Sequence, residues 1–338
     1  MSKKVKVAIV GCGAISGAYL KNAVNFPILE IAALADLNPA AAEKRAAEFN
    51  IGRVASVDQV LADPSIEIIL NLTVPKAHVP LGLRCIENKK HMFVEKPLGV
   101  NREEGLKLIE AARQKNLRVG CAPDTVLGAG IQTARKLIDD GAIGRPVAFT
   151  AFMMCPGHES WHPSPEFYYE VGGGPMFDMG PYYLTALLNL FGPVRRIMGS
   201  ATVAIPQRTI TSQPKHGKQI VVETPDHIAG TIDFENGVMG TIMTSFAVHG
   251  SPHPRITVFG TEGTMDVPDP NAFDGVVRAL HHCTSPHLYN LGHSDPVTLR
   301  DLITTLAQAL GKEPLIERLP EQPGDVRQTF ADISLARS

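Results

Sequence analysis

The sequence is poor in several residue types, and each shortage narrows what the chain can be. Its 338 residues include one tryptophan and five cysteines. The cysteines, at positions 12, 85, 121, 155 and 283, lack the spacing of a metal site, and their odd number suits reduced, cytoplasmic surroundings. No stretch approaches the ~20 apolar residues of a membrane helix. Met1–Lys4 leads into the first predicted strand without an apolar signal region. We therefore expect a cytoplasmic protein with no membrane partner.

An excess of charge of one sign is also missing. The chain carries 32 basic and 34 acidic residues, for a net charge of −2, and has no basic stretch. This balance argues against nucleic acid as a partner. The histidines at 249, 253, 281 and 282 lack a clear third ligand, so we expect no metal. The length suggests about two domains.

The stretch that organises the first half runs from Val5 to Gly17. Val5–Val10 predicts a strand buried on both faces, and Gly11 and Gly13 predict a tight turn into a helix that begins near Ala14. Gly13 lets backbone approach a pyrophosphate, which the positive end of the helix would attract. Ser16 occupies the third position of the fingerprint, where glycine or alanine is usual. The pattern predicts dinucleotide binding.

A second feature selects between dinucleotides. Asp36 follows the apolar run Ile31–Ala35, about 20 residues after the glycines. A carboxylate there accepts hydrogen bonds from the ribose hydroxyls and repels a 2′-phosphate, which favours NAD over NADP. The alternative is that Asp36 caps a helix, but Asn38-Pro39 already supplies a cap and a first-turn proline.

Strands and helices alternate through the first part of the chain. Further strands are predicted at 66–72, 91–94 and 117–121, and helices at 39–48, 76–89 and 101–115. This order predicts an α/β fold with a doubly wound parallel sheet, which binds ligands beyond the carboxyl ends of its strands.

The pattern changes after about residue 123. A helix at 131–140 precedes strand-like segments at 145–154, 195–205, 227–234, 238–247 and 255–260. Glu235-Asn236-Gly237 is a hairpin signal. We expect an α+β domain on a mostly antiparallel open sheet, and divide the chain at 1–123, 124–275 and 276–338. One face of this sheet suits a second subunit, so we expect a homodimer or homotetramer. An exposed face with scattered apolar residues is the alternative.

Two stretches carry candidate chemistry. Glu95-Lys96-Pro97 places a lysine at a strand end on the predicted cofactor side, where a desolvated amine could polarise a substrate oxygen. Gly172–Tyr183 places Asp178 and Tyr182 four residues apart, on one face if Asp178 begins a helix. The alternative is that Asp178 caps the helix 181–191 and Tyr182 packs in the core.

Together, these residues resemble the Gfo/Idh/MocA family of oxidoreductases over about residues 5–275. The resemblance rests on five segments: Gly11–Ser16, Asn71–Pro75 with His78, Glu95–Pro97, the Gly-Gly-Gly…Asp-x-Gly-x-Tyr run, and Gly260–Thr264. It implies an N-terminal Rossmann domain and an NAD-dependent oxidoreductase acting on a sugar, inositol or related polyol. Lys96 and Asp178 match the catalytic lysine and aspartate of the family. Tyr182 stands where many members have histidine and some have tyrosine.

From the pattern and the resemblance we expect two sets of contacts. The cofactor contacts are Gly11, Cys12, Gly13, Ala14, Ile15, Asp36, Leu37, Thr73, Pro75, His78, Glu95 and Lys96. The substrate contacts are Lys96, Trp161, His162, Asp178 and Tyr182. Trp161 and His162 belong to the polar-aromatic loop 158–169, which suits a sugar ring, although a packed interdomain loop is equally open.

The predicted mechanism is oxidation of a secondary alcohol. Tyr182, assisted by Lys96, takes the hydroxyl proton, while Asp178 hydrogen-bonds a neighbouring hydroxyl. An unperturbed tyrosine titrates near ~10, so this role requires a lowered pKa. Two alternatives stay open: a catalytically silent NAD(P)-sensing regulator, and a glycosidase that uses tightly held NAD.

The final stretch departs from this family. Residues 286–333, with Tyr289–Gly292 and Gln322–Val326, resemble the C-terminal segment of extended short-chain nucleotide-sugar epimerases. That segment lacks the epimerase dinucleotide domain and its catalytic Tyr-x-x-x-Lys, so it could not run that chemistry alone. Residues 296–310 predict an amphipathic helix.

Overall fold

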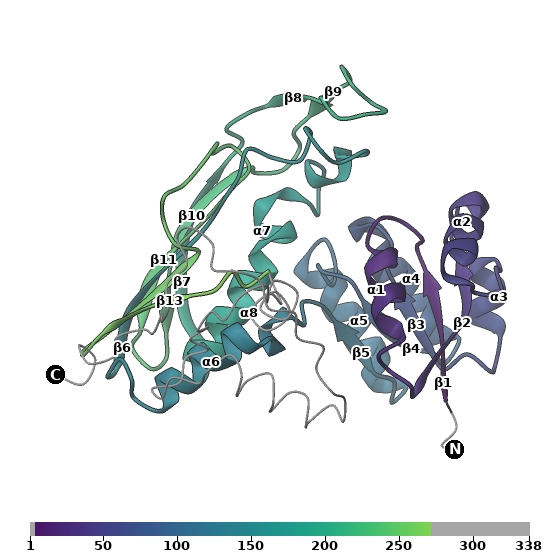
Figure 1. The fold of residues 1–338 in the computed structure, drawn as a ribbon, viewed down its shortest axis with the longest axis horizontal. Coiled ribbons are helices and arrows are strands. Elements are labelled where there is room, and N and C mark those ends of the chain that lie inside the picture. Colours follow the sequence, from purple (N-terminus) through teal and green to yellow (C-terminus); the bar gives the residue numbers. More distant parts are fainter. Residues whose placement is uncertain (1–3, 272–338) are drawn as a thin grey trace, which may run out of the picture.

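The first half of the chain folds as a doubly wound parallel sheet (Figure 1). The computed structural model describes residues 4–271, so the predicted helix at 296–310 and the epimerase-like segment lie outside the described residues. The strands stand in the order β2-β1-β3-β4-β5. They are β1 (Val5–Val10), β2 (Leu29–Ala35), β3 (Ile68–Asn71), β4 (His91–Val94) and β5 (Val119–Cys121).

Helices cover both faces of this sheet because successive side chains of each strand point to opposite faces. Ile9 of β1 packs with α1 and α2, whereas its neighbours Ala8 and Val10 pack with α3, α4 and α5. The helices are α1 (Ser16–Ala23), α2 (Pro39–Phe49), α3 (Val57–Ala62), α4 (Pro75–Glu87) and α5 (Arg102–Gln114).

Local signals explain most of these helix starts. The Asn38 side chain accepts a hydrogen bond from Ala40 N, and Pro39 opens α2, as predicted. Asn101 likewise accepts from Glu104 N at the start of α5. Helix α1 begins at Ser16, two residues later than predicted, after Ile15 with no side-chain cap. The sequence analysis did not predict α3, which begins with a capping box between Ser56 and Gln59.

The second half contains a six-stranded sheet in the order β13-β12-β6-β11-β10-β7. All neighbouring pairs are antiparallel except β11 and β6, which confirms a mostly antiparallel sheet. The strands are β6 (Pro146–Met154), β7 (Val194–Thr202), β10 (His227–Phe234), β11 (Met239–Ser245), β12 (Ile256–Gly260) and β13 (Thr264–Val267).

One face of this sheet carries the second core. Phe149 of β6, Phe234 of β10 and Phe191 of α8 pack together with ring centroids 5.3–5.8 Å apart. Figure 1 shows α7 and α8 on the side of the sheet that faces the first domain. The remaining elements are η1 (Thr125–Leu127), α6 (Ala129–Asp139), η2 (Glu166–Tyr168), α7 (Gly174–Asp178), α8 (Gly180–Phe191), and the hairpin β8 (Gln207–Thr209) with β9 (Gln219–Val221).

The glycine turn after β1 is required by the fold itself. Gly11 has φ +100°, and a Cβ there would lie 2.6 Å from the backbone of Leu72. A Cβ on Gly13 would meet no atom within 4 Å. Gly11 is therefore required because a side chain would collide with Leu72. At Gly13 the absence of a side chain leaves open space beside the turn.

We expect Gly11→Ala to lower the free energy of unfolding by at least about 1–2 kcal/mol, because a side chain there is both strained and in collision. Gly13→Ala is the matched control and should leave this free energy within about 0.5 kcal/mol. Urea denaturation of the protein without cofactor measures both. Equal loss in the two variants would contradict this account of the turn.

Candidate functional site

The expected cofactor residues gather at the carboxyl edge of the parallel sheet. Asp36 follows β2, and its carboxylate accepts hydrogen bonds from Cys12 N at 2.7 Å and from Asn38 N at 2.8 Å. These backbone bonds hold the carboxylate against the glycine turn, and each oxygen keeps a lone pair for another donor. The geometry therefore suits recognition of a ribose diol next to the turn.

The open space at Gly13 is the cradle that a pyrophosphate needs. Arg45 reaches this turn from α2, donating to Gly13 O at 3.1 Å and to Ser16 Oγ at 3.1 Å. Ser16 Oγ in turn donates to Gly13 O at 2.7 Å. A serine at the third fingerprint position thus braces the turn. A Cβ on the neighbouring Gly17 would come within 3.2 Å of Arg45.

Several apolar side chains are exposed to solvent at the carboxyl edge of the parallel sheet. Leu37 is 95% exposed, and Ile15 and Val74 are about half exposed. All three follow β1, β2 or β3, where a ring of the cofactor would cover them. The glycine cradle, the Asp36 carboxylate and this apolar rim together fit a dinucleotide such as NAD.

His78, Thr73 and Pro75 build the next part of the edge. His78 is buried; its Nδ1 lies 2.6 Å from Pro97 O and its Nε2 3.0 Å from Thr73 O. Each ring nitrogen thus faces a backbone carbonyl; because burial lowers the pKa of this imidazole, the neutral ring donates to only one of the two. The structure thus gives His78 a positioning role between two turns, and its expected contact with the cofactor stays a prediction. Thr73 Oγ1 donates to Asn71 Oδ1 at 2.6 Å, and Pro75 opens α4.

Glu95 is held from two sides. Its carboxylate accepts from the Tyr19 hydroxyl of α1 at 2.8 Å and from Lys96 N at 3.0 Å. Burial and the neighbouring Glu95 raise the pKa of Tyr19, so this phenol keeps its proton. Glu95 thereby ties the lysine-bearing turn to the helix that follows the glycines.

Lys96 reaches from the first domain to the second. Its Nζ donates to Asp178 Oδ1 at 2.6 Å and to Asp178 O at 2.7 Å, and both side chains are largely buried. Burial opposes ionisation of Asp178, but His158 and Lys96 outweigh it and lower the pKa of the carboxyl group. The site therefore contains a charged pair that spans the two domains.

Asp178 and Tyr182 do not lie on one continuous helix. Asp178 ends α7, and α8 starts at Gly180 after a break at Met179. The Asp178 side chain does not cap α8, which corrects the alternative reading of this residue. Both side chains nevertheless converge on Lys96, whose Nζ lies 5.2 Å from the centre of the Tyr182 ring.

The surroundings of Tyr182 disfavour a role as proton acceptor. Burial and the carboxylates of Glu95, Asp178 and Asp124 raise the pKa of its phenol. The predicted mechanism needed a lowered pKa. Lys96 lies over the ring face and makes no hydrogen bond to the Tyr182 hydroxyl within the described residues.

The loop after β6 brings a residue that the sequence analysis did not place in the catalytic set. His158 Nε2 lies 3.3 Å from Asp178 Oδ2, the carboxylate oxygen that Lys96 does not use. Its ring packs against those of Tyr168 and Phe246, with centroids 4.1 and 4.6 Å away. No local spacing joins His158 to Asp178, so only the fold reveals this contact.

A buried ionic network holds the same loop. Arg208 donates to Glu159 at 2.8 Å, to Asp226 at 3.0 Å and to Pro156 O at 2.9 Å. The side chains of Arg208 and Asp226 are 2% and 0% exposed. Tyr169 donates its hydroxyl proton to Glu159 and accepts from His158 N at 3.0 Å. This network positions the backbone of His158.

Trp161 and His162 lie on the rim of this loop. Trp161 is 60% exposed and packs edge-on against His158, with ring centroids 5.3 Å apart. His162 Nδ1 accepts from Ser164 N at 3.0 Å, and burial lowers the pKa of this imidazole. The exposed Trp161 ring is available to contact a ligand, whereas the His162 ring already accepts a hydrogen bond within the loop.

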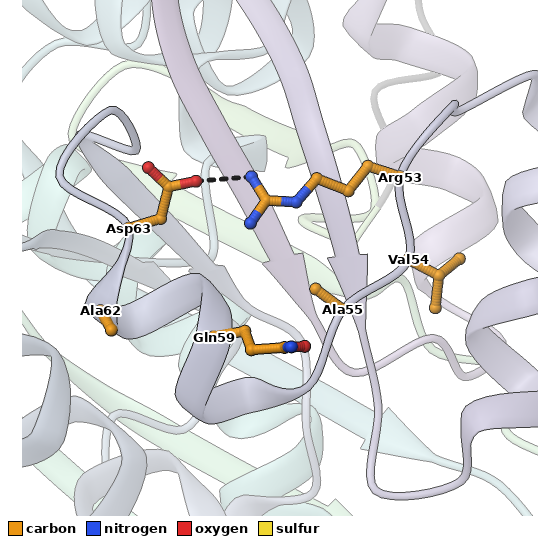
Figure 2. A pocket seen from close by; sticks show the side chains of 6 residues that line it. All are labelled: Arg53, Val54, Ala55, Gln59, Ala62 and Asp63. Atoms are coloured by element: carbon orange, nitrogen blue, oxygen red, sulfur yellow. Dashed lines mark hydrogen bonds and ion pairs between the residues drawn. The ribbon is translucent and has the colours of Figure 1, made fainter.

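A pocket on the first domain is lined by Arg53, Val54, Ala55, Gln59, Ala62 and Asp63 (Figure 2). Its polar side chains are already paired: Arg53 donates to Asp63 at 2.5 Å, and Gln59 accepts from Ser56 N at 2.8 Å. The polar side chains of this pocket are therefore already engaged within the protein.

Residues 4–271 hold no cluster of three or more metal-ligating side chains. The helices of the same residues are too short or too polar to cross a bilayer.

Comparisons with known proteins agree with this arrangement. Residues 5–122 match the model of the oxidoreductase family, NAD-binding Rossmann fold, and residues 131–266 match the GFO/IDH/MocA C-terminal domain. The epimerase likeness of the final stretch is not supported: the family matches end at residue 266, and the relatives found belong with the oxidoreductases.

Two curated relatives and one solved structure illustrate how similar this chain is to known proteins. The chain is 25% identical to scyllo-inositol 2-dehydrogenase (NAD(+)) of Bacillus subtilis, over 83% of this chain and 77% of that protein. It is 24% identical to 1,5-anhydro-D-fructose reductase of Ensifer adhaerens, over 89% and 93%. The structure of levoglucosan dehydrogenase with NADH and L-sorbose matches 78% of this chain and 72% of that one, with a TM-score of 0.67 and 24% identity, and shows a shared fold.

We expect Arg208→Met to lower the free energy of unfolding by about 3–5 kcal/mol, because it leaves the buried Asp226 carboxylate unpaired. The control is Arg195→Met, which removes an exposed partner of Asp233 and should change stability by less than about 1 kcal/mol. Chemical denaturation followed by circular dichroism measures both. Similar small effects in the two variants would show that the network does not hold the loop.

Proposed function

The chain belongs to the Gfo/Idh/MocA family of oxidoreductases, and from that premise we propose that it is an NAD-dependent dehydrogenase acting on a secondary alcohol of a sugar, inositol or related polyol. The observation that carries the proposal is the Lys96–Asp178 contact of 2.6 Å, where the edge of the NAD-binding domain meets the second domain. The curated relatives include dehydrogenases and reductases of this substrate class.

In this proposal the residues of the site have separate roles. Gly11, Gly13 and Asp36 hold the dinucleotide, which supplies a hydride acceptor when bound. The Lys96 ammonium donates a hydrogen bond to the substrate oxygen and stabilises negative charge as the O–H bond weakens. Asp178 pairs with Lys96 and fixes the direction of its amine. Tyr182 supplies a protonated phenol beside Lys96, and Trp161 offers an aromatic face to a sugar ring.

The charges around the site favour an uncharged substrate. Lys96 is paired with Asp178, and Lys76 with Glu170 of the second domain at 2.6 Å. Lys215 and Lys218 of the β8–β9 hairpin are both paired with Glu166. Lys96 and Lys76 each have a carboxylate of their own, so neither is free for a substrate carboxylate or phosphate, whereas Lys215 and Lys218 share one. Neutral polyols therefore fit better than sugar acids or sugar phosphates.

The open sheet supports the proposal of a homo-oligomer. Four threonines stand in register across neighbouring strands on the face opposite the core, namely Thr231, Thr241, Thr150 and Thr257. Met198, Met239 and Phe259 are exposed large apolar side chains of the same sheet. A flat face of small and apolar side chains suits a second copy of the chain. We also propose, as a separate point, that the boundary between the first and second domains lies at about residue 123.

A substrate screen tests the proposed activity directly. Neutral polyols, inositols and aldoses are incubated with NAD, and NADH absorbance at 340 nm is followed. We expect turnover with at least one neutral polyol and little with the matching phosphate or uronate. Substrate cleavage without net NADH would favour the glycosidase reading, and cofactor binding without turnover of any polyol would favour a silent regulator.

Lys96→Met should lower kcat by about a thousandfold, because the substrate oxygen loses its charged donor. NAD should still bind, since the glycine turn and Asp36 are unchanged; isothermal calorimetry measures this. Lys136→Met, an exposed lysine of α6, is the control and should keep full activity. Full activity in the Lys96 variant would end the proposal.

Thr241→Arg tests the oligomer, because it places a charge at the centre of the face proposed to be buried. We expect this variant to sediment at a lower mass than the parent chain in analytical ultracentrifugation. Thr209→Arg, on the β8–β9 hairpin, should leave the mass unchanged. An unchanged mass for the Thr241 variant, or a parent chain that is already monomeric, would contradict the proposed interface.

A further inference from the structure

One carboxylate binds two possible proton carriers in this site. Asp178 Oδ1 accepts from Lys96 Nζ at 2.6 Å, and Asp178 Oδ2 faces His158 Nε2 at 3.3 Å. The amine and the imidazole are thereby held on either side of a single carboxyl group. The proposed function uses Lys96 and Asp178 but leaves His158 without a role.

The contact with Asp178 determines how the imidazole is protonated. A nitrogen that faces a carboxylate carries the proton and donates it, so Nε2 is N–H and Nδ1 of the neutral ring is bare. No hydrogen-bond partner of Nδ1 is found within residues 4–271, and Nδ1 is absent from the described buried polar atoms that lack a partner. It therefore remains accessible as an acceptor. An aspartate in a Ser-His-Asp triad orients its histidine in the same way.

The alternative carrier, Tyr182, is disfavoured by its surroundings. Burial and three nearby carboxylates raise the pKa of the phenol. These carboxylates favour the neutral phenol and would oppose a phenolate. An imidazole, in contrast, is the side chain most often used as a general base in catalysis. The chain therefore has a better acceptor than the tyrosine that takes the place of the family's usual histidine.

The loop that carries His158 is built to hold it. Gly157 has φ +101°, and a Cβ there would collide with Tyr169, Glu159 and Arg208. The Arg208 network then fixes the residues on either side of His158. The imidazole ring itself packs against the rings of both Tyr168 and Phe246. Both backbone and ring are thus fixed before any substrate arrives, as a catalytic group requires.

The charged and titratable groups around His158 come from several elements. Asp178 faces it from α7, with Lys96 of the first domain behind that carboxylate. Tyr168 of η2 packs on the ring, and burial raises the pKa of that phenol. His162 of the same loop is close enough for His158 to lower its pKa further, after burial. Asp178 is the only one of these four that makes a hydrogen bond to the His158 ring.

We propose that His158, oriented by Asp178, is the acid–base residue of this enzyme. The inference rests on the proposed polyol dehydrogenase function. In alcohol oxidation the carbinol C–H bond breaks and its hydrogen leaves with both electrons to NAD⁺. The hydroxyl O–H bond also breaks, and its proton passes to His158 Nδ1 directly or through one water. The products are a ketone, NADH and an imidazolium that Asp178 stabilises and that later releases the proton to solvent. Lys96 stays an ammonium throughout.

The first test is the pH profile of kcat for alcohol oxidation with the polyol found in the screen. In the parent chain kcat should rise with pH across histidine's range, about pH 5–8, because only the neutral imidazole accepts a proton. His158→Gln should lower kcat about a hundredfold, leave KM for the polyol within about threefold, and lose this rise. Tyr182→Phe should keep the rise. His216→Gln, an exposed histidine on the β8–β9 hairpin, should keep both rate and profile.

A second test does not depend on activity. Nitrogen-15 NMR of the labelled protein without cofactor reports which imidazole nitrogen carries the proton. We expect Nε2–H for His158, and loss of this preference in Asp178→Asn, whereas His216 should not respond. A parent chain with the proton on Nδ1 would overturn the proposal, as would a rise in kcat that survives in His158→Gln.

These outcomes separate the two proposals. A parent chain that turns over no polyol removes the proposed function, and the catalytic role of His158 with it. A parent chain that is active, with an unaltered pH profile in His158→Gln, removes only the role of His158. A large rise in KM with little change in kcat would also remove that role, because it would show that His158 merely helps to form the binding surface.

Discussion

The ion pair between Lys96 and Asp178 is the interaction on which the site depends. Lys96 follows β4 of the first domain and Asp178 ends α7 of the second, and their side chains meet where both are about 85% buried. Two charges taken out of water are stabilising only if their geometry is good and their other hydrogen-bonding groups are satisfied. Here the ammonium also reaches Asp178 O, and the second carboxylate oxygen faces His158. Each domain therefore supplies half of a group that neither could keep charged and buried alone.

The residues around this pair act mainly by holding turns in place. His78 joins the turns after β3 and β4, Glu95 joins the lysine turn to α1, and Arg208 joins the His158 loop to the second sheet. All three use hydrogen bonds to backbone or to ionised groups, which are directional and stronger than neutral ones. The substrate-binding surface can then be formed by loops, while the charged groups of the site remain fixed.

Much of the fold could be predicted from patterns that are local in the sequence. The alternation of strands and helices, the glycine turn and the Asn38 and Asn101 caps depend on neighbouring residues, and the structure agrees with them. The short β8–β9 hairpin and β13 were not predicted, because three or four residues carry too little periodicity. A helix over 181–191 was predicted, and Pro181 lies in the first turn of α8, but the short α7 that ends at Asp178 was not predicted.

The candidate site was predictable only as far as its motifs reach. The Glu95–Pro97 and Gly172–Tyr183 stretches identified Lys96 and Asp178, and the fold brings them together. His158 and Arg208 have no such spacing: their partners Asp178 and Glu159 lie 20 and 49 residues away along the chain, and only the tertiary structure brings them together. His78 was found by a family motif, but only the fold shows that its two ring nitrogens face the backbone carbonyls of Pro97 and Thr73.

The apolar rim around the glycine turn has a thermodynamic consequence. Leu37 stands almost entirely in water in the protein without cofactor, together with parts of Ile15 and Val74. When the flat ring system of the dinucleotide covers these side chains, ordered hydration is released, and association then carries a negative change in heat capacity. The enthalpy of cofactor capture therefore becomes more favourable as the temperature rises, even where the affinity itself hardly changes.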